Sequence, residues 1–181
     1  PDTFCEDEPI ADEETGFLYC NGVTADSVPG DGPIGADALA NVEGETVSFV
    51  SQSSASGYLI PSLQLSENGV SPVDDIEATF AGGHDASVLA VYNGDATVGV
   101  SFNDARILLT EQFPDIGEEV VVFAWSAPIP NDGFAVAGDL PDDLKDGITD
   151  ALIDIASTEE GSEILFELYE ITDLVPADPS S

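Results

Sequence analysis

The chain is organised around the stretch Val47-Ser-Phe-Val-Ser-Gln-Ser-Ser-Ala-Ser-Gly-Tyr-Leu-Ile-Pro61. Its apolar beginning predicts a buried strand, its hydroxyl-rich middle predicts a loop, and a helix is expected from about Gly57. A helix start offers N–H groups without intrahelical acceptors and a partial positive charge, which suits an oxyanion such as phosphate, phosphonate or sulfate. Serine hydroxyls are also the usual caps of helices. From this stretch alone, oxyanion binding and simple capping both stay open.

Strand and helix patterns alternate on both sides of this stretch. Strands are predicted at 46–50, 76–80, 97–102 and 120–125, and helices at 35–42, 57–67 and 85–92, with a short helical or irregular piece at 103–113. Such alternation is typical of an α/β fold with a mainly parallel sheet and helices on both faces. Ligands of these sheets bind beyond the carboxyl ends of the strands.

The pattern changes at Ser126. Residues 126–132 contain two prolines, which predict a stiff connector. A short strand is expected at 134–137. Two amphipathic helices should follow, one ending near Ala156 and one starting near Ser157.

The charge of the chain is extreme. It has 37 acidic residues against two basic ones, Arg106 and Lys145, for a net charge of −35. This balance argues against binding to nucleic acids or anionic membranes. Because the acids are spread along the whole chain, adaptation to salty surroundings is the simplest explanation. Calcium binding is the alternative, but no Asp-x-Asp-x-Asp-Gly loop ending in Glu occurs. The sequence predicts no metal and no cofactor.

The two cysteines, Cys5 and Cys20, lie in the first segment. We predict a disulfide that stabilises the fold by about 3 kcal/mol, which implies an exported protein. Two unpaired thiols are the alternative. Together with the single distant histidine, His84, they make a poor zinc site. The sequence contains no apolar run long enough to span a membrane.

Four segments in this order resemble the phosphate/phosphonate/phosphite-binding family of ABC-transporter substrate-binding proteins. They are Ser53–Pro61, Gly82–Ala90, Asn93–Asp104 and Ser126–Asp132, and the likeness covers about residues 36–170. The resemblance implies a type II periplasmic-binding-protein fold, in which two lobes close around the ligand by hinge bending.

The same resemblance divides the chain into parts. It implies that residues 1–125 form the second lobe with an acidic, disulfide-stapled N-terminal excursion, that 126–132 are a hinge crossing, and that 133–181 belong to the first lobe. The N-terminal part that builds most of the first lobe in this family is absent from the sequence. We therefore expect one lobe together with the C-terminal helices of the other.

The resemblance also implies a ligand site at two helix starts. Ser53, Ser54 and Ser56 would hold the oxyanion together with neighbouring backbone N–H groups. His84 would donate an N–H to the same oxygens, whereas a surface or helix-capping histidine is the alternative.

Three further residues complete the expected site. Tyr58 would form a wall of the cleft, although core packing explains it nearly as well. Asp104 would accept hydrogen bonds from a ligand amine or a protonated phosphonate oxygen, or else cap a helix. Ser126 is another cleft candidate.

The function implied by the resemblance is an extracytoplasmic receptor, in the periplasm or on the cell surface. It would act as a monomer, with or without a lipid anchor, and deliver a phosphorus oxyanion to the permease of an ABC importer. A sensor or a structural surface module on the same fold are alternatives. We do not expect an enzyme, because the sequence has no Gly-x-Ser-x-Gly motif and no nucleophile paired with His84.

Overall fold

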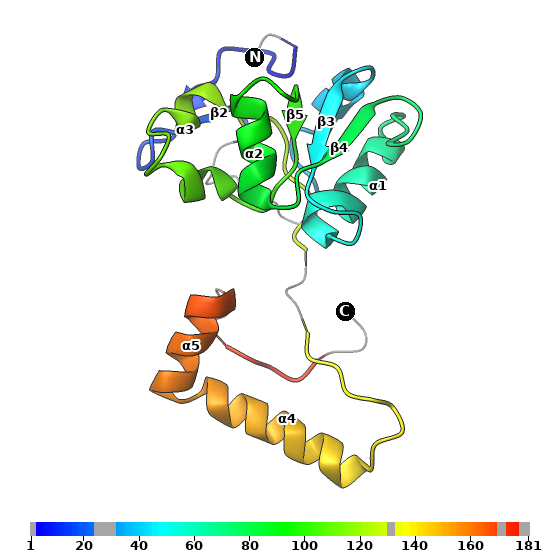
Figure 1. The fold of residues 1–181 in the computed structure, drawn as a ribbon, viewed down its shortest axis with the longest axis vertical. Coiled ribbons are helices and arrows are strands. Elements are labelled where there is room, and N and C mark those ends of the chain that lie inside the picture. The colour runs from blue at the N-terminus through cyan, green and yellow to red at the C-terminus, as the bar shows by residue number, and fades with distance from the viewer. Residues whose placement is uncertain (1–2, 24–31, 130–132, 170–172, 178–181) are drawn as a thin grey trace. The chain divides into compact units, whose positions relative to one another are not determined.

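The structure, a computed structural model, describes residues 3–23, 32–129, 133–169 and 173–177 (Figure 1). The chain divides into two compact units, residues 1–129 and 130–181. The elements of the first unit, in chain order, are β1 (Ile10–Ala11), β2 (Leu18–Tyr19), η1 (Ala36–Val42), β3 (Thr46–Phe49), η2 (Ala55–Leu59), α1 (Ile60–Glu67), β4 (Glu77–Phe80), α2 (His84–Tyr92), β5 (Val98–Gly99), η3 (Ala105–Leu109) and α3 (Ile116–Glu119).

A three-stranded parallel sheet forms the centre of the first unit. β3 lies in the middle, with β4 on one side and β5 on the other. Parallel neighbours need a crossover connection, and here η2 and α1 connect β3 to β4, while α2 connects β4 to β5. The predicted α/β fold with a parallel sheet is confirmed.

Helices pack against both faces of this sheet (Figure 1). Val47 and Phe49 of β3 are fully buried and pack with Leu65 of α1. The other side is closed by α2, where the buried hydroxyl of Ser87 donates to the Ser48 carbonyl oxygen at 2.8 Å. A second apolar cluster joins α2 to η3 and α3; it consists of Val88, Ala105, Leu109 and Ile116.

The N-terminal segment is an integral part of the first unit. The predicted disulfide between Cys5 and Cys20 is present. The two cysteines and Val23 form a buried cluster against which Trp125 packs. The indole N–H of Trp125 donates to the Val23 carbonyl oxygen at 3.3 Å. The N-terminal segment is therefore closed by a disulfide and packs on the segment that precedes residue 126.

Two predicted strands are wrong. Residues 120–125 are apolar but make only isolated bridges, Tyr19 with Val122 and Ile34 with Trp125. Their apolarity reflects half-burial against the N-terminal segment, not membership of the central sheet. Residues 134–137 contain no strand. Likewise, β5 is only two residues long within the predicted 97–102.

The second unit contains two helices that pack on each other, α4 (Asp142–Ala156) and α5 (Glu159–Tyr169). Both predicted amphipathic helices are confirmed. Apolar side chains remain exposed in this unit, among them Leu144, Ile155 and Phe166. In the described residues, no helix has the length and apolarity needed to cross a bilayer. The expected hinge lies partly outside the described residues, and the division into lobes stays a prediction.

Candidate functional site

Three loops carrying predicted site residues leave the same edge of the sheet. The strand pairs Phe49–Phe80 and Ser48–Gly99 place the carboxyl ends of β3, β4 and β5 side by side. Residues 50–56, 81–84 and 100–104 follow these ends, and we call them together the site edge. Open α/β sheets bind ligands at such an edge.

The serine loop, residues 51–56, leads directly into a helix. The Ser54 Oγ accepts a hydrogen bond from the Gly57 N–H at 3.0 Å and thereby caps η2, which continues into α1. The cap leaves the earlier N–H groups of Ala55 and Ser56 without intrahelical acceptors, at the positive end of the helix dipole. Ser53 is exposed and Ser56 is half-buried beside them. The structure therefore brings the three predicted serines together.

Gly57 allows this tight loop to form. A Cβ atom at Gly57 would lie 2.4 Å from the Cγ2 atom of Val50. The Val50 N–H also donates to the Gly57 carbonyl oxygen at 3.1 Å. Any larger residue would push the helix start away from the end of β3.

His84 begins α2 at the same edge. Its Nδ1 accepts a hydrogen bond from the Phe102 N–H at 2.9 Å, which ties the loop after β4 to the loop after β5. The imidazole also packs on the Phe102 ring, with centroids 4.7 Å apart. Burial lowers the pKa of His84 below its ordinary value of 6.5, and the Asp85 carboxylate opposes this shift. At neutral pH the ring is therefore an uncharged donor.

Asp104 lies in the third loop, but its carboxylate is engaged within the protein. Its Oδ1 accepts from the Arg106 N–H at 3.1 Å, which makes it the cap of η3. Its Oδ2 accepts from the Tyr19 hydroxyl at 2.9 Å and also pairs with the Arg106 guanidinium. Asp104 therefore caps a helix, which was the alternative to ligand binding. A contact between Asp104 and a ligand stays a prediction.

Tyr58 and Ser126 have packing or local roles in the structure. The Tyr58 ring stands edge-on to Phe49, with centroids 5.0 Å apart, and lies 5.3 Å from the Phe80 ring. It extends the aromatic core toward the site edge. The Ser126 hydroxyl donates to the Ala127 carbonyl oxygen at 2.7 Å. Ser126 does not belong to the three loops that follow β3, β4 and β5, so the strand ends do not bring it to the serines.

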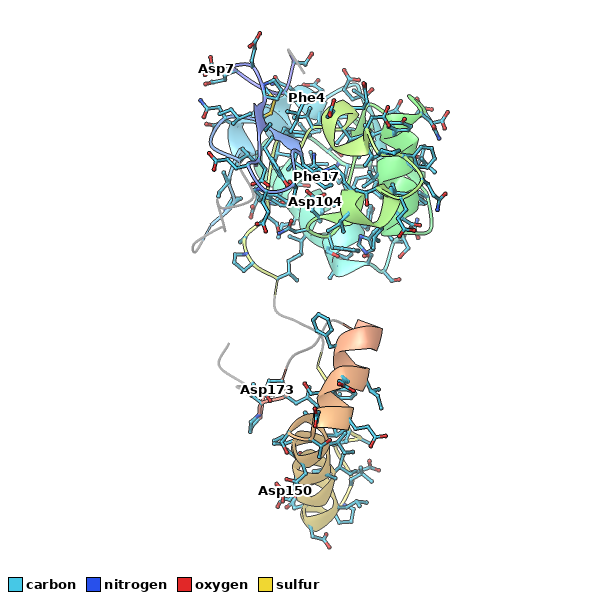
Figure 2. All side chains as sticks on the ribbon, turned by 90° about the vertical axis from the view of Figure 1, so that its left-hand side faces the viewer. Phe4, Asp7, Phe17, Asp104, Asp150 and Asp173 are labelled. Carbon is cyan, nitrogen blue, oxygen red and sulfur yellow. A yellow bond between two sulfur atoms is a disulfide. The ribbon has the colours of Figure 1, made fainter. Side chains whose placement is uncertain are left out.

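Sequence reasoning missed the role of Arg106. This arginine is 1% exposed, and its guanidinium lies over the rings of Phe17 and Tyr19 (the Phe17 and Asp104 side chains are labelled in Figure 2). It also donates to the carbonyl oxygens of Leu18 and Val120. A lone arginine two residues after Asp104, in so acidic a chain, was the available signal. It holds the N-terminal segment onto the loop that follows β5.

A cavity of about 410 Å³ lies elsewhere in the first unit. Phe4, Cys5, Asn21, Asp37 and Phe123 are among the residues that line it, beside the disulfide and η1. None of the predicted ligand residues lines this cavity. The cavity is separate from the candidate site.

The fold and the site edge define a class of protein: an α/β unit with neutral hydrogen-bond donors at the carboxyl ends of its parallel strands. The family model for periplasmic phosphonate substrate-binding proteins of ABC transporters matches residues 25–181. The chain belongs to this family. The family consists of transport binding proteins, not of enzymes.

Two relatives of known role are similar in sequence. The phosphate-import protein PhnD of Mycolicibacterium smegmatis is 42% identical over 74 residues, which is 37% of this chain and 23% of that protein. The phosphonates-binding periplasmic protein of Escherichia coli is 28% identical over 170 residues, 87% of this chain and 50% of that protein. The chain thus spans half or less of the length of these relatives.

Solved structures show the same fold. PhnD1 from Prochlorococcus marinus in complex with methylphosphonate has a TM-score of 0.58 at 18% identity, covering 80% of this chain and 56% of that one. The binding-protein component of an ABC phosphonate transporter from Pseudomonas aeruginosa has a TM-score of 0.55 at 26% identity, covering 74% and 45%.

Proposed function

We propose that this chain forms the ligand-binding lobe of an extracytoplasmic receptor for a phosphorus oxyanion, which passes its ligand to the permease of an ABC importer. The observation that carries the proposal is the convergence of the capped serine loop, the start of α2 and the uncharged His84 at one strand edge. Phosphate, which the Mycolicibacterium smegmatis relative imports, and methylphosphonate, which is bound in the Prochlorococcus marinus structure, belong to this chemical class. We assign no catalytic role and expect a monomer.

An anion can bind to so acidic a protein because the donors at the site are local and neutral. Hydroxyls, backbone N–H groups and an imidazole N–H stabilise an oxyanion without a cation, most effectively where water is partly excluded. The exposed carboxylates are screened over about 8–10 Å or less at physiological or higher salt. Helix starts that face the site add favourable partial charge.

A thermal-shift screen in high salt tests the proposal. The ligands are phosphate, phosphite, methylphosphonate and 2-aminoethylphosphonate, with sulfate as the isosteric control. Ligand at 100 times its dissociation constant should add about 2.7 kcal/mol to the free energy of unfolding. A shift with a phosphorus oxyanion and none with sulfate is expected. Equal shifts with sulfate, or no shift with any ligand, would contradict the proposal.

A further inference from the structure

The imidazole of His84 is held by a backbone group from a different loop. The Phe102 N–H donates to His84 Nδ1 at 2.9 Å, across 18 residues of sequence. Both residues lie on firmly packed supports. The Ser87 hydroxyl of α2 accepts from the Val100 N–H at 3.1 Å and donates to the Ser48 carbonyl oxygen, so α2 is tied to the segment that leads to Phe102.

This contact constrains where the imidazole carries its proton. A backbone N–H is always a donor, so its partner nitrogen must be an acceptor without a proton. In a neutral imidazole with an unprotonated Nδ1, the proton lies on Nε2. The other tautomer and the imidazolium would both place two N–H groups against each other. One backbone amide thus disfavours two of the three protonation states of His84.

The surroundings of His84 act in the same direction. Burial, to which the apolar Phe102 ring contributes, opposes the charged form. The Asp85 carboxylate on the same helix favours the charged form but only partly offsets burial, so the pKa of His84 stays below its ordinary value. On the neighbouring loop, Asp104 and Arg106 are paired with each other.

We propose that the Phe102 amide is a positioning group that selects the Nε2–H tautomer of His84, so that the ring presents one neutral N–H donor to the phosphorus oxyanion. The ligand half of this inference rests on the proposed function. The tautomer half concerns the unliganded protein alone. The donor is therefore set before the ligand arrives, with no proton transfer needed on binding.

The chain offers a direct measurement, because His84 is its only histidine. Nitrogen NMR of protein labelled with ¹⁵N-histidine gives one pair of ring signals. Without ligand at pH 7.5, we expect an unprotonated Nδ1 and a protonated Nε2, and a titration midpoint below 6.5. A protonated Nδ1, or a midpoint at or above 6.5, would overturn the inference.

Two substitutions separate the amide from the ring. Phe102→Pro removes the N–H, and we expect it to give a mixture of tautomers. Phe102→Leu keeps the N–H but loses the aromatic contact, and the Nε2–H tautomer should persist. A Phe102→Pro protein with the wild-type tautomer ratio would refute the role of the amide. If that variant does not fold, the wild-type spectrum still tests the assigned tautomer, because a protonated Nδ1 would overturn the inference.

Adding methylphosphonate at saturation distinguishes this inference from the proposed function. A shift of the Nε2 signal with an unchanged tautomer supports both. A thermal shift without any change at His84 overturns the ligand half of the inference and leaves the receptor function standing. For affinity, His84→Ala should weaken binding by about 10- to 100-fold, the loss of one hydrogen bond to a charged group. His84→Gln, which keeps a neutral amide donor, should recover part of that loss; equal losses would contradict the donor role.

Discussion

At the scale of single residues, one oxygen atom can serve both interpretations of Ser54. Its Oγ accepts from the Gly57 N–H, which uses a lone pair. The hydroxyl hydrogen remains free to donate, because a hydroxyl group is a donor and an acceptor at once. Capping and ligand binding are therefore compatible at Ser54. Comparison with the neighbouring Ser53 separates the two roles experimentally.

Ser54→Ala and Ser53→Ala should have different effects on stability. Loss of the cap at Ser54 should lower the free energy of unfolding by about 1 kcal/mol. Ser53 is exposed, so its loss should change stability by no more than about 0.5 kcal/mol. Both should weaken methylphosphonate binding, since each removes a donor near the helix start. Denaturant unfolding and calorimetric titration measure the two effects. Wild-type affinity in both variants would reject the serine site.

Tyr19 makes stability depend on alkaline pH. Burial and the Asp104 carboxylate raise the pKa of Tyr19 to about 12, with Arg106 opposing. Because the ordinary tyrosine pKa is about 10, the folded state holds this proton more tightly than the unfolded state. The resulting stabilisation is complete below pH 10 and is lost as the pH rises from about 10 to 12. Denaturant unfolding at pH 9 to 11.5 should show this decline.

Tyr19→Phe should reduce that decline and should also cost stability at pH 7. The lost hydrogen bond to Asp104 is about 2.9 Å long and partly buried, and bonds to charged groups contribute about 1.5–3 kcal/mol. Tyr92→Phe is the matched control, because its hydroxyl donates to Asp115 at 2.9 Å in an exposed position. The control should cost less than about 0.5 kcal/mol at pH 7. Equal losses of stability in Tyr19→Phe and Tyr92→Phe would show that burial does not strengthen the hydrogen bond between Tyr19 and Asp104.

At the scale of elements, periodicity and turn signals were enough to predict the parallel sheet and its helices. β3 and β4 lie within the predicted strands, and α1, α2, α4 and α5 agree with predicted helices to within a few residues. These elements have strong local patterns. Residues 120–125 lack their predicted strand because apolar sequence reports burial, whereas strand formation also needs a neighbouring backbone to pair with.

The start of the helical segment that follows β3 shows another limit of local patterns. The turn at residues 55–59 is a π-helix, in which the N–H of Ile60 donates to the carbonyl oxygen of Ala55, five residues earlier. It is accommodated where Gly57 packs directly on Val50. Packing between the loop and the end of β3 decides this geometry. Hydrophobic periodicity therefore predicts that a helix exists here, but not the width of its first turn.

The disulfide between Cys5 and Cys20 stabilises the N-terminal segment. The double substitution Cys5→Ser/Cys20→Ser should lower the free energy of unfolding by about 3 kcal/mol, because the bridge closes a loop with a sequence separation of 15. Trp125, the only tryptophan, packs on the cysteine cluster and reports on it by fluorescence. Reductant should lower the melting temperature of the wild-type protein and leave that of the double variant unchanged. An unchanged wild-type melting temperature under full reduction would contradict this prediction.

At the scale of the whole molecule, the order of strands predicts which edge of the sheet a ligand would use, because parallel strands align their carboxyl ends. The resemblance to the family added the expectation that Ser54 and His84, 30 positions apart in the sequence, bind one ligand, and that expectation stays a prediction. The Phe102 contact with His84 could not be predicted, since a backbone N–H has no sequence signature. The same is true of Arg106, whose partners come from three separated segments. The sequence thus predicts the strand edge at which these loops meet, but not the hydrogen bonds that orient their side chains.

The net charge of −35 makes salt a determinant of stability for the whole chain. Exposed acids such as Asp7 and Asp150 project from both units (Figure 2). Their repulsion opposes compact states and is screened as the Debye length falls from about 10 Å at 0.1 M to about 3 Å at 1 M salt. We expect 1 M NaCl to add at least about 1 kcal/mol to the free energy of unfolding. For a chain of this size, that amount corresponds to a rise of roughly 2–4 °C in melting temperature.

Screening can be separated from other effects of salt. KCl at equal ionic strength should act like NaCl, whereas sucrose, which stabilises compact states without screening charge, should give the same increment at low and high salt. A variant with Asp7→Asn, Glu111→Gln, Asp150→Asn and Glu160→Gln removes four exposed charges and should respond less to NaCl. An unchanged salt response in this variant would mean that ion exclusion or a specific cation, and not repulsion between surface carboxylates, sets the salt requirement.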